Sequence, residues 1–113
     1  MITKDRKMQK KFDRNYCPAS PLLEWLGNKW AMVVLLRLEE QGTMRFNELF
    51  RTIPRVSEKM LTSAMKHLVD NGLAERRVYA EVPPKVEYSL TPLAKAFLTQ
   101  LHALIDWGKE NIK

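Results

Sequence analysis

The sequence predicts a mainly α domain with one small β-hairpin, an α+β class, and three observations predict it. Residues 57–71 carry apolar side chains at helical spacing and follow a shorter helix and a turn. Two strand-like segments joined by a proline-rich turn come directly after that helix. A long apolar helix then covers residues 91–112. Helix, turn, helix and hairpin in this order are the layout of a winged helix-turn-helix.

The composition predicts one globular domain with a preference for polyanions. The 113 residues fit a single domain, and 45% hydrophobic with 28% charged residues is an ordinary globular mixture. A formal net charge of +6 and a pI of about 9.6 favour a polyanionic partner.

Several classes of protein are not expected from this sequence. No apolar run reaches the roughly 18 residues that span a bilayer, and the first residues have no apolar core typical of a secretory signal. Cys17 is the only cysteine, which excludes an internal disulfide and a multi-cysteine metal site. His67 and His102 are far apart, and no glycine-rich phosphate loop, nucleophile elbow or HExxH motif occurs. We therefore expect a cytoplasmic protein that is not an enzyme, has no metal or cofactor, and does not enter membranes.

Residues 1–14 form a basic tail ahead of a single domain at residues 15–113. Six cations against two carboxylates give the tail a net charge of +4. The tail is either a solvated terminus or an arm that contacts phosphates or a partner subunit.

Three helices and a short strand are predicted before residue 57. Prolines break the chain before an apolar helix at 22–26, which Gly27 and Asn28 end as a C-terminal cap. A second helix at 30–38 supplies core residues, namely Met32, Val33, Leu35, Leu36 and Leu38. A very short strand at 43–46 leads into a third helix at 47–52, which Asn47 or its neighbour could cap. Its inward residues are predicted to be Leu49, Phe50 and Ile53.

The helix at 57–71 has two distinct faces. Ser57 is a good N-cap, and the buried face is predicted to contain Met60, Leu61, Ala64, Met65 and Leu68. The opposite face carries short polar or cationic groups, namely Glu58, Lys59, Thr62, Ser63 and Lys66. This face fits insertion into a DNA groove, and it equally fits an ordinary solvated helix.

The hairpin at 74–90 is predicted to be a wing. Strands at 73–79 and 85–90 flank a Val82-Pro83-Pro84 turn, where the prolines bar strand pairing. Arg76, Arg77 and Lys85 suit phosphates or a minor groove, although each of them could be an ordinary exposed strand residue.

The last helix begins with Thr91 as N-cap and Pro92 in its first turn. Its apolar stripe consists of Leu93, Ala94, Phe97, Leu98, Leu101, Leu104 and Ile105, with Trp107 close behind. Such a stripe can serve dimerisation, and dimers match palindromic operators. The alternative is packing on the domain's own core.

The order of short motifs carries a family resemblance over roughly residues 16–110. The motifs are Cys17-Pro18, Leu26-Gly27-Asn28-Lys29-Trp30, Arg45-Phe46-Asn47-Glu48-Leu49, Met60-Leu61-Thr62, Leu68-Val69-Asp70-Asn71-Gly72-Leu73 and the hairpin sequence from Tyr79 to Thr91. In this combination the chain resembles the HxlR-type winged-helix transcriptional regulators, relatives of the MarR-like group.

The resemblance implies a homodimeric bacterial or archaeal regulator that binds double-stranded DNA. The first and last helices would build the dimer through Leu22, Leu23, Phe97, Leu98, Leu101, Leu104 and Ile105. The helix at 57–71 would enter the major groove with Ser57, Lys59, Thr62, Ser63 and Lys66. Arg45 and Arg55 would hold the phosphate backbone, and Lys85 with the proline tip would form the wing. Many relatives carry arginine where Lys85 stands, so this chain keeps the charge but loses a bidentate fork.

Cys17 allows two interpretations. A free cysteine is usually a small buried hydrophobe. Because Cys17-Pro18 precedes a helix, however, the positive end of the helix dipole could lower the thiol pKa. Several relatives sense oxidants, quinones or aldehydes through a cysteine at the matching place. The resulting hypothesis is a redox or electrophile sensor at Cys17, with an unidentified small-molecule or oxidant effector.

Overall fold

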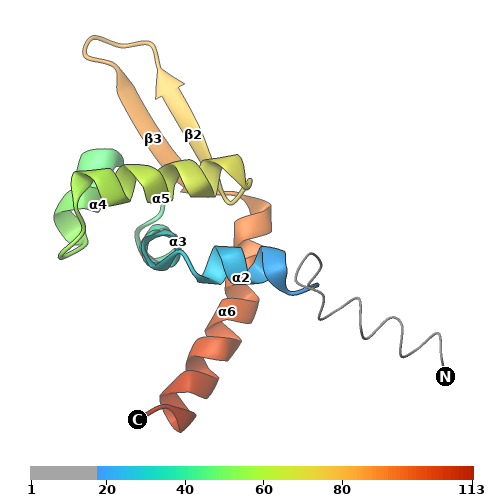
Figure 1. The fold of residues 1–113 in the computed structure, drawn as a ribbon. Coiled ribbons are helices and arrows are strands. Elements are labelled where there is room, and N and C mark those ends of the chain that lie inside the picture. Colours follow the sequence, from blue (N-terminus) through green and yellow to red (C-terminus); the bar gives the residue numbers. More distant parts are fainter. Residues whose placement is uncertain (1–17) are drawn as a thin grey trace.

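The computed structural model describes residues 18–113, which fold into five helices and one three-stranded sheet (Figure 1). The basic tail and Cys17 lie outside the described residues. In chain order the elements are α2 (Ser20–Leu26), α3 (Lys29–Gln41), β1 (Met44–Arg45), α4 (Phe46–Thr52), α5 (Glu58–Asp70), β2 (Ala74–Tyr79), β3 (Lys85–Leu90) and α6 (Pro92–Asn111). The predicted winged helix-turn-helix is confirmed.

The sheet is antiparallel with strand order β1-β3-β2. The hairpin register runs from Ala74 opposite Leu90 to Tyr79 opposite Lys85, and β1 adds Met44 opposite Tyr88. In Figure 1 the free end of the hairpin projects away from the helices, as a wing requires. Pairing of β1 with β3 attaches the base of the wing to the start of α4.

Side-chain caps define where three of the helices begin. The Ser57 and Thr91 hydroxyls accept hydrogen bonds from the backbone N–H groups of Met60 and Ala94, at 3.0 and 3.1 Å. Both caps were predicted from the sequence. Gly27 is the C-cap of α2 as predicted, and the backbone N–H of Asn28 donates to the carbonyl of Trp25 at 3.3 Å. Asn28 has a second role that was not predicted, because its side chain accepts from the N–H of Ala31 at 3.1 Å and so begins α3. Gly27 has φ of −72°, a right-handed value that any residue adopts.

The N-terminus of α4 is capped by a side chain that belongs to the helix itself. The Glu48 carboxylate accepts a hydrogen bond from the backbone N–H of Arg45 at 2.9 Å. This acidic side chain also lies in the first turn, where the helix dipole favours negative charge. The capping side chain is therefore that of Glu48, the neighbour of Asn47, and not that of Asn47 itself.

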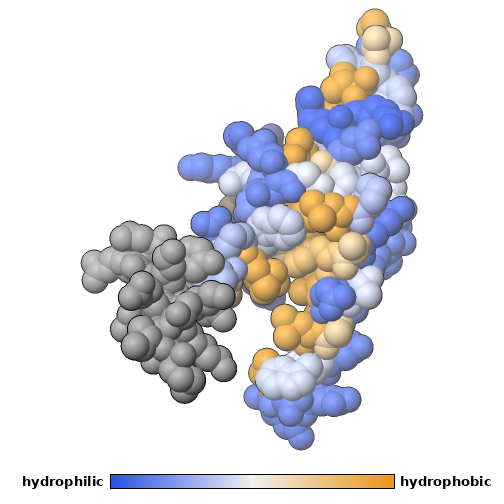
Figure 2. Space-filling view, turned by 90° about the vertical axis from the view of Figure 1, so that its right-hand side faces the viewer, coloured by the Kyte–Doolittle hydropathy of each residue, from blue (hydrophilic) through white to orange (hydrophobic). Residues whose placement is uncertain are grey.

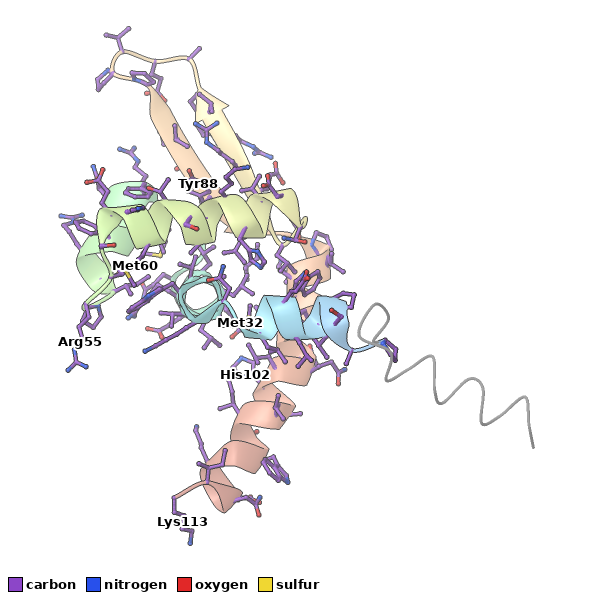
Figure 3. The ribbon with its side chains drawn as sticks, viewed as in Figure 1. Met32, Arg55, Met60, Tyr88, His102 and Lys113 are labelled. Atoms are coloured by element: carbon purple, nitrogen blue, oxygen red, sulfur yellow. The ribbon has the colours of Figure 1, made fainter. Side chains whose placement is uncertain are left out.

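One hydrophobic core joins α3, α5 and α6. Its largest fully buried side chains are Leu35, Leu38, Leu49, Leu61, Leu68, Leu73, Leu98 and Val34. Val33 and Leu36, predicted as core, are only partly buried against this cluster. Outside the cluster, the His102 imidazole meets the Glu39 carboxylate and ties α6 to α3 (Figure 3).

Two apolar residues predicted to face inward are exposed instead. Phe50 is 39% exposed and stacks on Phe46, one turn earlier on α4, with ring centroids 6.5 Å apart. Met60 is 42% exposed because it lies about 100° around α5 from Leu61, at the edge of the buried arc. Leu61, Ala64, Met65 and Leu68 form the buried face as predicted.

None of the helices between residues 18 and 113 is long and apolar enough to cross a membrane.

Candidate nucleic-acid interface

The outward face of α5 presents four of the five residues predicted to enter a DNA groove. Lys59, Thr62, Ser63 and Lys66 are all exposed, and together with Glu58 they line a shallow hollow of about 630 Å³. Burial of Leu61, Ala64, Met65 and Leu68 on the opposite side fixes this face outward. The fifth residue, Ser57, has its hydroxyl engaged as the helix cap.

The two lysines of this face differ in their electrostatic surroundings. Lys66 Nζ lies 2.8 Å from Asp70 Oδ2, one turn along α5, and the hydrogen bond and charge of Asp70 raise the pKa of Lys66. Lys59 makes no ion pair within the part of the chain that the structure describes. Lys59 is therefore the cation on α5 that can meet a phosphate without giving up an internal partner.

The wing cations also divide into paired and unpaired groups. Arg77 contacts Glu75 at 2.8 Å, and this hydrogen bond is the largest of the contributions that raise the pKa of Arg77. Lys85 lies 3.3 Å from Glu87 and 5.0 Å from the centre of the Tyr79 ring. Arg76 has no ion pair among residues 18–113.

Arg45 lies beside a residue that the sequence interpretation missed. Arg45, Asn47, Glu48, Phe50, Arg51 and Glu87 line a hollow of about 760 Å³ between α4 and the sheet. Arg51 is exposed and stands one turn after Asn47 on α4. This i, i+4 spacing was visible in the sequence and could have indicated Arg51 as a second cation beside Arg45.

Arg55 occupies the turn between α4 and α5 in a left-handed conformation, with φ of 68°. A residue with a side chain is held there at a cost of about 1–2 kcal/mol. In Figure 3 its side chain points away from the hairpin. The predicted contact of Arg55 with a phosphate therefore stays a prediction.

An apolar surface lies away from the reading face, on α2 and α6. Figure 2 shows hydrophobic surface in the middle of one face and again lower down, along the extended end of the molecule that α6 occupies in Figure 1. Leu22 and Leu23 of α2 are 47% and 58% exposed, and Leu104 and Trp107 of α6 are 51% and 58% exposed. These four exposed apolar side chains are the candidates for a contact with a partner.

The residues predicted for the dimer interface differ in how exposed they are in the structure. Leu22, Leu23 and Leu104 are exposed, whereas Phe97 and Ile105 are partly buried against the core. Leu98 is fully buried and Leu101 nearly so, because both face the interior of the domain. Leu98 is thus a core residue with no surface to offer a partner, and its assignment to the interface is corrected.

Comparisons with known proteins agree with this geometry. The sequence profile of the HxlR-like helix-turn-helix family matches residues 25–113. An HTH-type transcriptional regulator of Methanothermobacter thermautotrophicus is 41% identical over 97 residues, which cover 86% of this chain and 73% of that protein.

Two solved structures of redox-related regulators are similar over most of their length. The reduced form of the transcriptional regulator YodB from B. subtilis has a TM-score of 0.77 at 33% identity, covering 86% of this chain and 95% of that one. The redox regulator HypR in its oxidized form has a TM-score of 0.74 at 35% identity, covering 86% and 99%. The profile match spans most of the chain, and the relatives share its helix-turn-helix and wing. The chain belongs to the HxlR-like helix-turn-helix family of transcriptional regulators.

Proposed function

We propose that this regulator binds a palindromic DNA operator as a homodimer, with α5 in the major groove and the β2–β3 hairpin on the adjacent backbone or minor groove. One observation carries the proposal: Lys59, Thr62, Ser63 and Lys66 share one exposed face of α5, next to a projecting hairpin. A recognition helix requires such a face, since hydroxyl and ammonium groups reach base edges and phosphates. Such a role places the protein in the cytoplasm.

The chemistry of the face indicates how affinity and specificity are divided. None of its four side chains has the forked geometry that pairs with a base in two places. Thr62 and Ser63 therefore supply modest or water-bridged specificity, and the cations supply most of the affinity. The alternative is a winged-helix module that binds a protein instead.

An electrophoretic mobility shift with the DNA upstream of the protein's own gene distinguishes the two functions. A DNA-binding regulator shifts this fragment at concentrations that leave an unrelated fragment of equal length unbound. A protein-interaction module binds both fragments equally or neither of them. Footprinting of the shifted complex then gives the operator and shows whether it is palindromic.

Lys59→Ala is expected to weaken operator binding more than Lys66→Ala. Each lost phosphate contact lowers affinity and reduces the slope of log K against log salt by about one unit. Lys66 must first break its ion pair with Asp70 before it can contact a phosphate, so its net contribution to DNA affinity is smaller. Binding is measured by fluorescence anisotropy across a salt series, with Lys109→Ala, at the far end of α6, as a control. If Lys59→Ala matched the parent at every salt concentration, α5 would not lie in the groove as proposed.

We further propose that Cys17 makes operator binding responsive to oxidants or electrophiles. Support comes from its position just ahead of α2 and from the similarity to YodB and HypR, whose structures are named by redox state. Modification at this position, or pairing across a dimer, would change the spacing of the two recognition helices.

Treatment with the thiol oxidant diamide is expected to change the operator affinity of the parent protein. The operator affinity of Cys17→Ser is expected to stay the same. Because Cys17 is the only cysteine, one substitution removes every thiol from the chain. Mass spectrometry of the treated protein identifies the product at Cys17, whether an intermolecular disulfide or an adduct. An unmodified Cys17, or a parent whose binding ignores diamide, would refute the sensor while leaving the DNA-binding proposal intact.

A further inference from the structure

The turn that ends α5 is held by both helices that carry the exposed apolar side chains. On α2, the indole Nε1–H of Trp25 donates a hydrogen bond to Oδ1 of Asn71 at 3.3 Å. From the start of α6, the hydroxyl of Thr91 donates to the backbone carbonyl of Gly72 at 2.6 Å. The other side-chain hydrogen bonds of α5 between residues 18 and 113 stay within the helix and its caps. Side-chain bonds from α2 and α6 therefore meet at one end of α5 (Figure 1).

The side-chain amide of Asn71 has a partner on both sides, which fixes its orientation. Its Nδ2 donates to the backbone carbonyl of His67 at 2.8 Å and lies 3.4 Å from Nδ1 of the His67 ring. A reversed amide would place its oxygen against that carbonyl and its NH₂ group against the indole N–H, so both hydrogen bonds would be lost. Asn71 therefore presents an acceptor to α2 as long as α5 keeps its last turn.

The indole of Trp25 is held in place by contacts other than this hydrogen bond. Its ring lies edge-on to Phe97 of α6, with ring centroids 5.4 Å apart and an interplanar angle of 84°. The side chain is also partly buried against the hydrophobic core. Because ring packing does not need the N–H group, the donor can be removed while an aromatic ring stays in this position.

Asn71 lies at the opposite end of α5 from the reading residue Lys59. The two are 12 positions apart, which is about 18 Å along a helix that rises about 1.5 Å per residue. A rotation of about 10° at Asn71 would move Lys59 by about 3 Å, close to the rise of about 3.4 Å between base pairs. Apolar packing has no preferred direction, whereas a hydrogen bond requires its donor and acceptor to align. A bond at Asn71 can therefore fix the angle of α5 more closely than the core does.

We propose that Trp25 and Asn71 are positioning residues that set the angle of α5 relative to α2 and α6. Since these two helices carry the exposed apolar side chains, they would define how far apart the two copies of α5 lie in a homodimer. The hydrogen bond thereby determines which spacing of half-sites the dimer accepts. This inference rests on the proposed homodimer and operator, although neither residue belongs to the reading face.

Trp25→Phe is expected to reduce the preference for one half-site spacing, and not only the affinity. Phenylalanine keeps a ring against Phe97 but has no N–H to donate. Fluorescence anisotropy gives the affinity for the footprinted operator and for the same operator with one base pair inserted between its half-sites. We expect the ratio of these two affinities to fall at least about fivefold in the variant. A general loss of structure lowers both affinities alike and leaves the ratio unchanged.

Two further single variants and one double variant show whether the hydrogen bond itself is responsible. Trp30→Phe is the matched control, because the Trp30 ring lies under Lys29 Nζ at 5.2 Å and its N–H has no hydrogen-bond partner in the part of the chain that the structure describes. Asn71→Ala removes the acceptor at a φ of −96°, which alanine adopts, and should lower the ratio as Trp25→Phe does. The double variant should lower it no further, since both substitutions remove one bond. A parent-like ratio in Trp25→Phe and Asn71→Ala, or an equal fall in Trp30→Phe, would overturn the inference.

The angle of α5 is also tested without DNA, by double electron–electron resonance of the full chain. A nitroxide on Glu58→Cys in a Cys17→Ser background marks the first turn of α5, and the distance between the two labels of a dimer measures the separation of the two helices. Trp25→Phe and Asn71→Ala should displace or broaden this distance, and Trp30→Phe should leave it unchanged.

The outcomes separate this inference from the proposed function. A distance that is the same in the parent, Trp25→Phe and Asn71→Ala would overturn the positioning role and leave the proposed function intact. A dimeric parent that shows the expected changes in distance but binds no DNA would support the positioning role and refute the operator. A parent without coupling between labels would be a monomer, which would refute the proposed homodimer and this inference with it.

Discussion

Leu104→Glu is expected to make the protein monomeric and to weaken operator binding by at least about a hundredfold, or roughly 2.7 kcal/mol. Leu104 is 51% exposed on the half of α6 that extends beyond the domain in Figure 1. In a symmetric dimer the substitution places two carboxylates in an apolar contact, where neither has a partner. A monomer then holds one half-site and loses the contacts of the other.

Leu93→Glu is the matched control for this variant. Leu93 is also 51% exposed on α6 and receives the same charge, but it lies at the opposite end of the helix, near Gly72. Analytical ultracentrifugation should show a dimer for the parent and for Leu93→Glu, and a monomer for Leu104→Glu. A parent protein that is monomeric in solution yet binds its operator with full affinity would refute the link between dimerisation and binding.

Local chemistry explains why much of the fold could be predicted from the sequence. The helix predicted at 57–71 is observed as α5 with Ser57 and Asn71 as its caps, because cap, apolar period and stop signal are all local. Strand β3 was predicted with its observed bounds, since two prolines mark where the turn must end. Thr91 and Pro92 likewise fixed the start of α6.

The sequence-based predictions failed at positions whose burial depends on residues far away in the sequence. Pairing of β1 with β3 joins segments about forty residues apart and places the start of α4 against the sheet, while Phe50 lies on the face of α4 that stays exposed. Periodicity along α6 showed a wide stripe but could not divide it into core and surface, so Leu98 was placed in the interface. A further hollow, between α5 and the hairpin, requires four elements to meet, and no local pattern indicates it.

Which cations form ion pairs within the domain could not be predicted from local sequence either. Arg76 and Arg77 are adjacent and chemically identical, yet Arg77 contacts Glu75 and Arg76 faces α5. Strand alternation predicts that the two point to opposite faces, but only the docking of α5 determines which face carries the hollow. The position of α5 on the sheet therefore decides which of the two arginines lines the hollow.

Leu61→Ala is expected to lower the free energy of unfolding by about 3 kcal/mol, because Leu61 is fully buried and its removal leaves a cavity beneath α5. Met60→Ala, at the neighbouring position, is expected to cost less than about 1 kcal/mol, since Met60 is 42% exposed. Urea unfolding at one fixed protein concentration measures both values, because the stability of a dimer depends on concentration.

This pair of variants tests the orientation of the recognition helix as well as its packing. Met60 and Leu61 are about 100° apart around α5, so the ratio of the two losses reports which side faces the core. If Met60→Ala were as destabilising as Leu61→Ala, α5 would be rotated toward Met60 and away from the orientation described. Lys59, Thr62, Ser63 and Lys66 would then no longer be centred on the exposed side. The proposed reading face thus depends on a difference in stability that can be measured without any DNA.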